Sequence, residues 1–214
     1  MVDTDKKTVY CSGALFSPEE LASMSEISQV LETHGYNTYL PQRDGVEAFV
    51  MNAIDRSTTN SRLFRPLTKL VNRAVFALDI YQIVDACDYF VFNMNGRVPD
   101  EGGVVETAVA LTRGKPIIIY KNDQRNMLFG FDSPMLMGAS YTYSVVDEIG
   151  KIPSELNKLI EKMDTLGDYQ PRADDLPPMV KQASKFGRKV WRFIQAIQFL
   201  KPTNQLLKNN ELVS

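Results

Sequence analysis

One stretch of the sequence, residues 76–121, constrains the fold more than any other. It contains an apolar run from Tyr89 to Asn93, then a polar loop, the pair Gly102-Gly103 and a helical pattern. Such a run predicts a buried strand, and glycines at a helix start predict a tight turn after it. In a parallel sheet this loop lies at the carboxyl edge, where helix N-termini favour negatively charged groups. The stretch therefore predicts a ligand crevice at that edge.

Three carboxylates are expected to meet in this crevice. Asp100 lies on the loop, Glu106 follows near the start of the helix, and Asp79 belongs to the helix before the strand. Each alone has an ordinary explanation, because loops and first helical turns commonly carry acidic residues. Three carboxylates brought together shift one another's pKa values, which is typical of functional sites. We therefore interpret them as a candidate catalytic set.

The remainder of the chain repeats the order strand, helix, strand. Strands are predicted over 8–12, 38–40, 89–93, 117–120 and 141–146, and most are separated by helical patterns. This alternation predicts right-handed crossovers and a parallel sheet with helices on both faces. The expected fold is α/β: a flavodoxin-like (Rossmann-like) five-stranded sheet over residues 1–150. A helical C-terminal extension over 151–214 is expected to pack on the domain or on another subunit.

Breaks in the helical pattern divide two parts of the chain. Residues 46–85 predict two helices, interrupted near 57–61 and at Pro66, and residues 168–178 predict a polar linker. The last helix, predicted over 179–200, is basic, so lying on a membrane surface is a less favoured alternative to packing. Its basic residues are Lys181, Lys185, Arg188, Lys189 and Arg192.

The composition of the chain limits the classes of molecule that it is expected to bind. The 214 residues are 44% hydrophobic, which suffices for a sizeable core, and the net charge of −2 offers no basic field for nucleic acid. A small-molecule ligand is therefore expected, with neither nucleic acid nor membrane as partner. The first residues lack the apolar run of a signal peptide, and no segment is long and apolar enough to span a bilayer. These features predict a cytoplasmic protein.

Histidine and cysteine usage argues against several chemistries. Cys11 and Cys87 fall at or beside predicted core strands, so we expect buried, reduced thiols. His34 is the single histidine, and it is expected near the exposed end of the first helix. This pattern offers no Ser-His or Cys-His pair for nucleophilic catalysis. We predict neither a metal site nor an organic cofactor.

The central stretch also carries a family resemblance. It resembles the core of the nucleoside 2-deoxyribosyltransferases over about residues 8–146. In that family an Asp, a second Asp and a Glu six residues later form the catalytic set, which implies Asp79, Asp100 and Glu106 here. The resembling segments are Ala77-Leu78-Asp79, Cys87-Asp88, Asn95-Gly96-Arg97-Val98-Pro99-Asp100-Glu101-Gly102, Glu106 and Gly114-Lys115-Pro116.

The resemblance implies further site residues. Tyr10 would orient Glu106 through a phenolic hydrogen bond, and side chains after the second strand would bind the edge of the nucleobase. The loop after Lys121 would reach into a neighbouring subunit, where Ser133 replaces a family Asn that holds the sugar 5′-hydroxyl. A homo-oligomer with shared active sites is thus implied. The expected substrate-binding residues are Tyr10, Gly13, Phe16, Gln42, Asp44, Gly102, Ser133 and Met135.

The implied activity exchanges the base of a 2′-deoxynucleoside for a free nucleobase, as in nucleotide salvage. Glu106 would attack C1′ to form a covalent deoxyribosyl ester, which a second base then displaces with net retention. Asp100 would face the leaving base and either exchange a proton with it or bind its edge. Asp79 would hold sugar hydroxyls or assist Asp100. No cofactor is required.

Alternatives stay open at this point. If water reaches the ester, the protein is a nucleoside or deoxynucleotide N-glycosidase. Relatives that hydrolyse 5′-monophosphates carry Arg in the segment after the first strand, whereas residues 12–17 contain none, which favours a nucleoside. A non-catalytic nucleotide-binding module would keep the fold without turnover. A phosphoribohydrolase-type Gly-Gly loop fits poorly, because the Pro before the glycines is missing.

Overall fold

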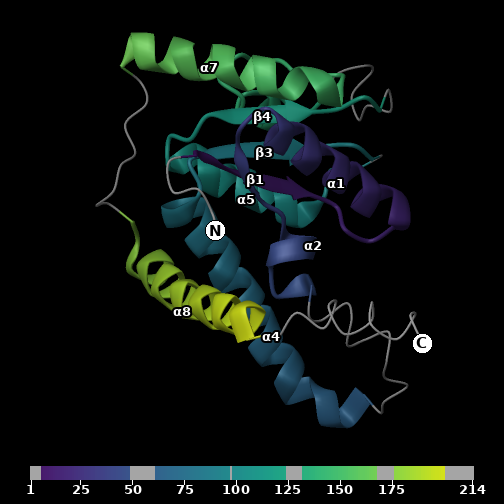
Figure 1. Cartoon of the computed structure of the whole chain (residues 1–214), viewed down its shortest axis with the longest axis vertical. Coiled ribbons are helices and arrows are strands. Elements are labelled where there is room, and N and C mark those ends of the chain that lie inside the picture. Colours follow the sequence, from purple (N-terminus) through teal and green to yellow (C-terminus); the bar gives the residue numbers. More distant parts are fainter. Residues whose placement is uncertain (1–5, 49–60, 97, 124–131, 168–175, 201–214) are drawn as a thin grey trace, which may run out of the picture.

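The computed structural model describes residues 6–48, 61–96, 98–123, 132–167 and 176–200. These residues form an α/β fold around one parallel sheet, as the alternating sequence pattern predicts (Figure 1). The strand order is β2-β1-β3-β4, and every pairing is parallel. The strands are β1 (Thr8–Gly13), β2 (Asn37–Tyr39), β3 (Tyr89–Asn93) and β4 (Ile117–Tyr120).

The fifth strand predicted over 141–146 does not form. This segment turns instead, with Tyr143 at a positive φ of 53°, and Val146 makes an isolated parallel bridge to Tyr120. A residue in the left-handed region interrupts an extended backbone, so only the end of the segment reaches the edge of β4. The described sheet therefore has four strands rather than five.

Helices connect the strands and flank the sheet. Helix α1 begins at Pro18 as predicted, behind a capping box in which Ser17 Oγ accepts from Glu20 N at 3.2 Å and Glu20 Oε2 accepts from Ser17 N at 2.9 Å. The bounds are α1 (Pro18–Thr33), α2 (Pro41–Asp44), α4 (Ser61–Tyr81), the π-helical turn η1 (Gln82–Ala86), α5 (Glu101–Thr112), α6 (Pro134–Met137), the 3-10 turn η2 (Ile149–Lys151), α7 (Ile152–Leu166) and α8 (Pro178–Leu200).

The second helix of the β2–β3 connection is longer than predicted. Helix α4 continues through Pro66, which the sequence pattern takes as a break. Pro66 is the sixth residue of α4, beyond the four N–H groups that lack a helical partner, so the helix gives up one backbone hydrogen bond there. The predicted first helix, the interruption predicted near 57–61 and the linker predicted over 168–178 fall largely outside the described residues.

The sheet separates two layers of helices (Figure 1). On one face α1 and α7 pack against alternating strand residues such as Val9, Cys11 and Val91. On the other face Tyr10, Phe90 and Phe92 pack with residues of α4, α5 and α8. This alternation along each strand assigns odd-numbered residues of β1 to one core and even-numbered residues to the other. Tyr10 therefore lies on the face that carries α5.

Helix α8 lies beside α4 of the same chain (Figure 1). The helices approach so closely at Gly187 that a Cβ there would stand 1.8 Å from the backbone oxygen of Ala77. Arg188 lies over the ring of Tyr81, 5.5 Å from its centroid, and 3.3 Å from Asp85 Oδ2. Helix α8 thus packs against α4, while the predicted division of the chain at residue 150 stays a prediction.

The close helix crossing predicts a large stability effect at Gly187. We expect Gly187→Ala to lower the free energy of unfolding by about 3 kcal/mol, because the added methyl must push two backbones apart. Gly150→Ala is the matched control, since a Cβ at Gly150 meets nothing within 4 Å. Urea unfolding of both variants measures the difference. Equal stability of the two would contradict the close crossing.

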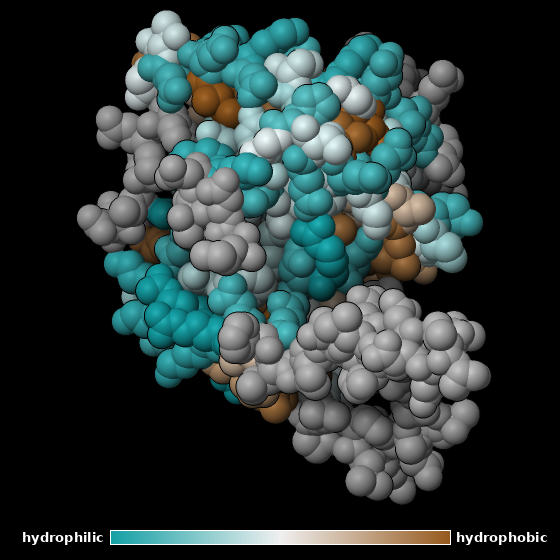
Figure 2. Space-filling view, in the orientation of Figure 1, coloured by the Kyte–Doolittle hydropathy of each residue, from teal (hydrophilic) through white to brown (hydrophobic). Residues whose placement is uncertain are grey.

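The outer surface of the described residues is mostly hydrophilic on the face shown in Figure 2, with hydrophobic atoms in small separate areas. Cys11 and Cys87 are free and buried, as predicted. Among the helices that the structure describes, none combines the length and apolar character needed to cross a membrane.

Candidate active site

A cleft of about 1220 Å³ opens at the carboxyl ends of β1 and β3. It lies where the strand–glycine–helix pattern predicts a crevice. Its wall is formed by the loop after β1, the start of α5 and one side of α4, and it carries an unusual number of acidic side chains. These are Glu20, Glu47, Asp79, Asp100, Glu101 and Glu106.

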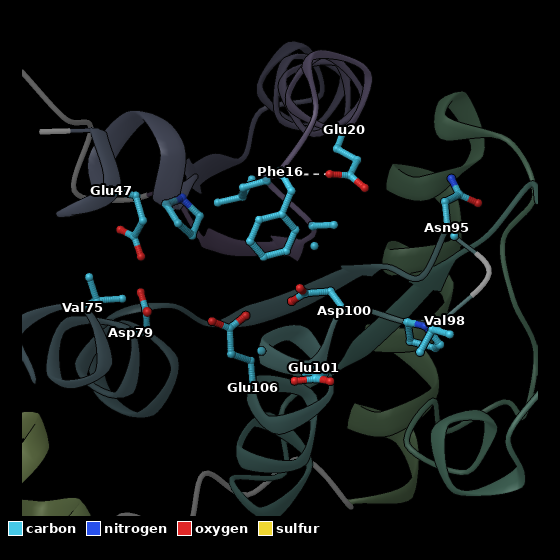
Figure 3. Close-up of a pocket in the computed structure, with 17 residues that line it drawn as sticks. Phe16, Glu20, Glu47, Val75, Asp79, Asn95, Val98, Asp100, Glu101 and Glu106 are labelled. Carbon is cyan, nitrogen blue, oxygen red and sulfur yellow. Dashed lines mark hydrogen bonds between the residues drawn. The ribbon is translucent and has the colours of Figure 1, made fainter. Parts of the chain in front are cut away.

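Two residues of β1 donate hydrogen bonds to the carboxylate of Glu106. Tyr10 Oη donates a hydrogen bond to Glu106 Oε1 at 2.9 Å, and Ser12 Oγ donates one to Oε2 at 2.6 Å. Tyr10 and Ser12 can both reach the carboxylate because residues two apart on a strand share a face. The hydrogen bond expected between Tyr10 and Glu106 is thus present, whereas that from Ser12 is not foreseen. Together they fix the carboxylate at the cleft wall (Figure 3).

Asp100 and Gly103 place the start of α5 against the sheet. Asp100 is the N-cap of the helix, and its Oδ2 accepts a hydrogen bond from Gly103 N at 2.7 Å. A Cβ on Gly103 would stand 2.3 Å from Phe92 Cε2 and 3.0 Å from Ser12 Oγ. Only glycine lets the helix approach this closely. Because α5 packs so closely on the sheet, Glu106, one helical turn after Gly103, lies within hydrogen-bonding distance of side chains of β1.

Asp79 completes the predicted set. It reaches the cleft from α4, and Figure 3 shows Glu106 between Asp79 and Asp100. Burial raises the pKa of Asp79 well above its ordinary value, and the charges of Glu47 and Glu106 raise it further. Asp79 Oδ1 is buried and has no hydrogen-bond partner among the described residues. The structure therefore brings the three predicted carboxylates to one cleft.

Burial also raises the pKa of Glu106. The hydrogen bonds from Ser12 and Tyr10 oppose this shift, and the charge of Asp100 adds to it. A carboxylate that accepts hydrogen bonds while largely desolvated is more basic and more nucleophilic than one in water.

Glu47 is an acidic residue of the cleft that the sequence pattern does not single out. It follows α2, and Figure 3 shows its carboxyl group directed toward Asp79. Burial raises the pKa of Glu47 from 4.5 to about 7, and the charge of Glu106 contributes. Glu47 Oε2 is buried without a hydrogen-bond partner among the described residues. The sole sequence signal was a carboxylate shortly after the carboxyl end of a predicted strand.

The remaining predicted residues divide between the cleft and other places. Gly13, Phe16 and Gly102 line the cleft, and Phe16 is 86% exposed there. Gln42 and Asp44 do not line it. Gln42 Nε2 donates to Leu21 O at 2.9 Å, and Asp44 Oδ2 accepts from Leu40 N at 2.9 Å.

Ser133 and Met135 lie at the start of α6 and do not line the cleft of their own chain. Met135 is 85% exposed. Their expected role concerns a neighbouring subunit, so it stays a prediction. Arg97, part of the resembling segment, lies outside the described residues.

The raised pKa of Glu47 predicts a pH-dependent stability. Between pH 4.5 and about 7 the folded chain holds a proton that the unfolded chain has lost. The free energy of unfolding should therefore fall as pH rises through this window, by up to about 3 kcal/mol from this group. Glu47→Gln should make the dependence shallower, which urea unfolding at both ends of the window measures. An unchanged slope would show that Glu47 titrates normally.

Fold and site together define a class: an α/β protein with a hydrogen-bonded, partly desolvated carboxylate at the carboxyl edge of a parallel sheet. Such an arrangement suits chemistry on a small ligand. The model of the family described as Nucleoside 2-deoxyribosyltransferase matches residues 9–175. The chain therefore belongs to the nucleoside 2-deoxyribosyltransferase family, as the resemblance of its central stretch predicts.

Two solved structures are similar to part of this chain. A conserved protein from Enterococcus faecalis V583 is 17% identical, with a TM-score of 0.46, and the match covers 72% of this chain and 98% of that one. A 2-deoxyribosyltransferase from Leishmania mexicana is 17% identical, with a TM-score of 0.41, and the match covers 73% of this chain and 96% of that one. No curated protein sequence gives a significant match. The family assignment rests on the family model.

Proposed function

We propose that the protein is a nucleoside 2-deoxyribosyltransferase that exchanges the base of a 2′-deoxynucleoside through a covalent deoxyribosyl-Glu106 intermediate. The observation that carries this proposal is the position of Glu106. Its carboxylate is held by hydrogen bonds from Tyr10 and Ser12 and lies at the wall of an open cleft, between Asp79 and Asp100.

In the first half-reaction a Glu106 oxygen attacks C1′ of the bound nucleoside. The C1′–N bond breaks, its electron pair passes to the base nitrogen, and a glycosyl ester forms. A 2-deoxyribose favours this step, because it lacks the electronegative 2′-hydroxyl that destabilises the oxocarbenium-like transition state. Asp100 would contact the departing base; Figure 3 shows it at the opposite side of Glu106 from Asp79.

In the second half-reaction another nucleobase attacks C1′ and releases Glu106. Two inversions at the same carbon give net retention. The residues assigned to the reaction supply a nucleophile and proton-exchanging groups, so the proposed reaction uses neither a metal nor an organic cofactor.

We further propose a homo-oligomer in which Ser133 and Met135 of one chain complete the cleft of another. The exposure of Met135, 85%, supports a contact with another chain. The ligands of this assembly would be 2′-deoxynucleosides and free nucleobases. The cytoplasmic location and the place in nucleotide salvage stay predictions.

Hydrolysis is a second candidate activity. The cleft is wide, and Phe16 at its side is 86% exposed, which favours access of water to a glycosyl ester. If water is the acceptor, the protein acts as an N-glycosidase on the same substrates.

Product analysis tests the proposal and separates the two activities. A 2′-deoxynucleoside is incubated with the protein, with and without a second nucleobase, and the products are separated by chromatography. Transfer predicts a new deoxynucleoside that requires the second base. Free deoxyribose formed at the same rate in both mixtures would identify a hydrolase. A protein that binds the nucleoside but releases no base would be a binding module.

A further inference from the structure

Glu47 and Asp79 form a pair of carboxyl groups that the assigned roles do not explain. They come from different elements and face each other across one end of the cleft (Figure 3). Each has a buried oxygen without a hydrogen-bond partner in the described part of the chain, Glu47 Oε2 and Asp79 Oδ1. Buried polar atoms of this kind are uncommon in proteins, and at a cleft they indicate groups kept for a ligand.

A phenol group lies beside this pair. A Cβ on Gly45 would stand 2.4 Å from Glu47 Oε2 and 3.0 Å from Tyr39 Oη, so both oxygens border the space beside Gly45. Tyr39 Oη is likewise buried and unpartnered among the described residues. Glycine at position 45 leaves room for the carboxyl group of Glu47 to turn inward.

The surroundings of Glu47 and Asp79 disfavour a negative charge on both carboxyl groups at once. Facing groups are Glu106 from α5 and the phenols of Tyr10 and Tyr39, and no Lys or Arg is among the described residues that line the cleft. Arg43, the nearest arginine in sequence, forms ion pairs with Glu32 and Asp44 at 2.8 Å. Burial and the charge of Glu106 raise the pKa values of both carboxyl groups, and the charge of Glu47 raises that of Asp79 further. Two such groups keep one proton between them near neutral pH.

We propose that Glu47 and Asp79 together hold one proton and deliver it to the nucleobase as it departs. This inference rests on the proposed deoxyribosyl transfer and names the proton donor for it. Asp100, whose Oδ2 already accepts a hydrogen bond as the helix cap, lies on the other side of Glu106 and does not supply the proton.

The proton transfer balances the charge of the covalent step. Glu106 loses its negative charge when its oxygen bonds C1′, and the pair gains one negative charge when its proton moves to the base nitrogen. The total charge of the three carboxyl groups is therefore unchanged. The negative charge of Glu106 raises the pKa values of Glu47 and Asp79. Ester formation removes that charge, so both pKa values fall at the moment when the base needs a proton. In the second half-reaction the incoming base returns a proton to the pair as it bonds C1′.

The test compares two substrates that differ in their need for a proton. A purine deoxynucleoside must be protonated as its base leaves, whereas its N7-methylated form carries a positive charge and releases a neutral base without one. We expect Glu47→Gln to lower kcat/KM for the ordinary substrate by ~10³-fold. For the methylated substrate we expect a loss below ~10-fold, because only proton delivery is impaired. Activity on the methylated substrate also shows that the variant is folded.

Two controls complete this experiment. Glu161→Gln removes an exposed carboxylate of α7, which does not line the cleft, and it should leave both substrates nearly unaffected. The wild type should lose activity on the ordinary substrate toward high pH, as the pair loses its proton, whereas the methylated substrate should show no such loss. An equal loss on both substrates in Glu47→Gln would overturn this inference but would leave the proposed function standing. A wild type that releases no base from any deoxynucleoside would instead overturn the proposed function.

Discussion

Glu106→Gln is expected to lower kcat/KM for base release by ~10⁴-fold, because an amide cannot form the glycosyl ester. The substitution keeps the size of the side chain and an oxygen that accepts from Tyr10. It therefore removes the nucleophile with little disturbance of the cleft. Initial rates with a saturating acceptor base, measured by chromatography, give the comparison.

The matched control for Glu106→Gln lies on the same helix. Glu101 is exposed at the first turn of α5, and Glu101→Gln changes the charge by the same amount. A general electrostatic effect of the acidic cleft would slow both variants alike. A loss confined to Glu106→Gln indicates a role at the reacting carbon. Near-normal turnover by Glu106→Gln would exclude the proposed mechanism.

Removing the two hydrogen bonds behind Glu106 gives the second large effect. We expect Tyr10→Phe and Ser12→Ala each to lower kcat/KM by ~10- to 100-fold, since each removes a hydrogen bond to a charged oxygen. Phe keeps the ring contacts of Tyr10, which stacks on Phe90 with centroids 5.4 Å apart. The double variant should lose more than either single variant.

The pH profile separates this effect from a change in packing. Both hydrogen bonds lower the pKa of Glu106, whereas burial raises it. Without them the pKa rises, and the carboxylate form appears only at higher pH. The acidic limb of the profile of kcat/KM should therefore move to higher pH in each variant. A uniform loss of activity at all pH values would instead indicate a disturbed cleft.

Strands β3 and β4 could be predicted from the sequence because they are buried on both faces. Their continuous apolar runs give them the predicted bounds, Tyr89–Asn93 and Ile117–Tyr120. Beyond β4, the edge strand of the described sheet, this signal fails. The positive φ of Tyr143 is set by a turn whose residues favour a strand when read alone. Helix α4 continues through Pro66 although proline commonly marks a break.

The candidate site was predictable to the extent that topology alone determines it. Asp79, Asp100 and Glu106 meet because parallel strands end at one edge of the sheet. The orientation of side chains after β2 depends on local geometry. The short helix α2 places Gln42 against Leu21 of α1 and leaves Glu47 to face the cleft.

The position of Glu106 in the reaction can be tested directly by mass spectrometry. The protein is mixed with a 2′-deoxynucleoside without acceptor base, quenched in acid and digested with trypsin. We expect the peptide of residues 98–113 to gain the mass of one deoxyribosyl group, and fragmentation should place that group on Glu106 rather than Asp100 or Glu101. Base release with no modified peptide, or with the sugar on another carboxylate, would contradict the account.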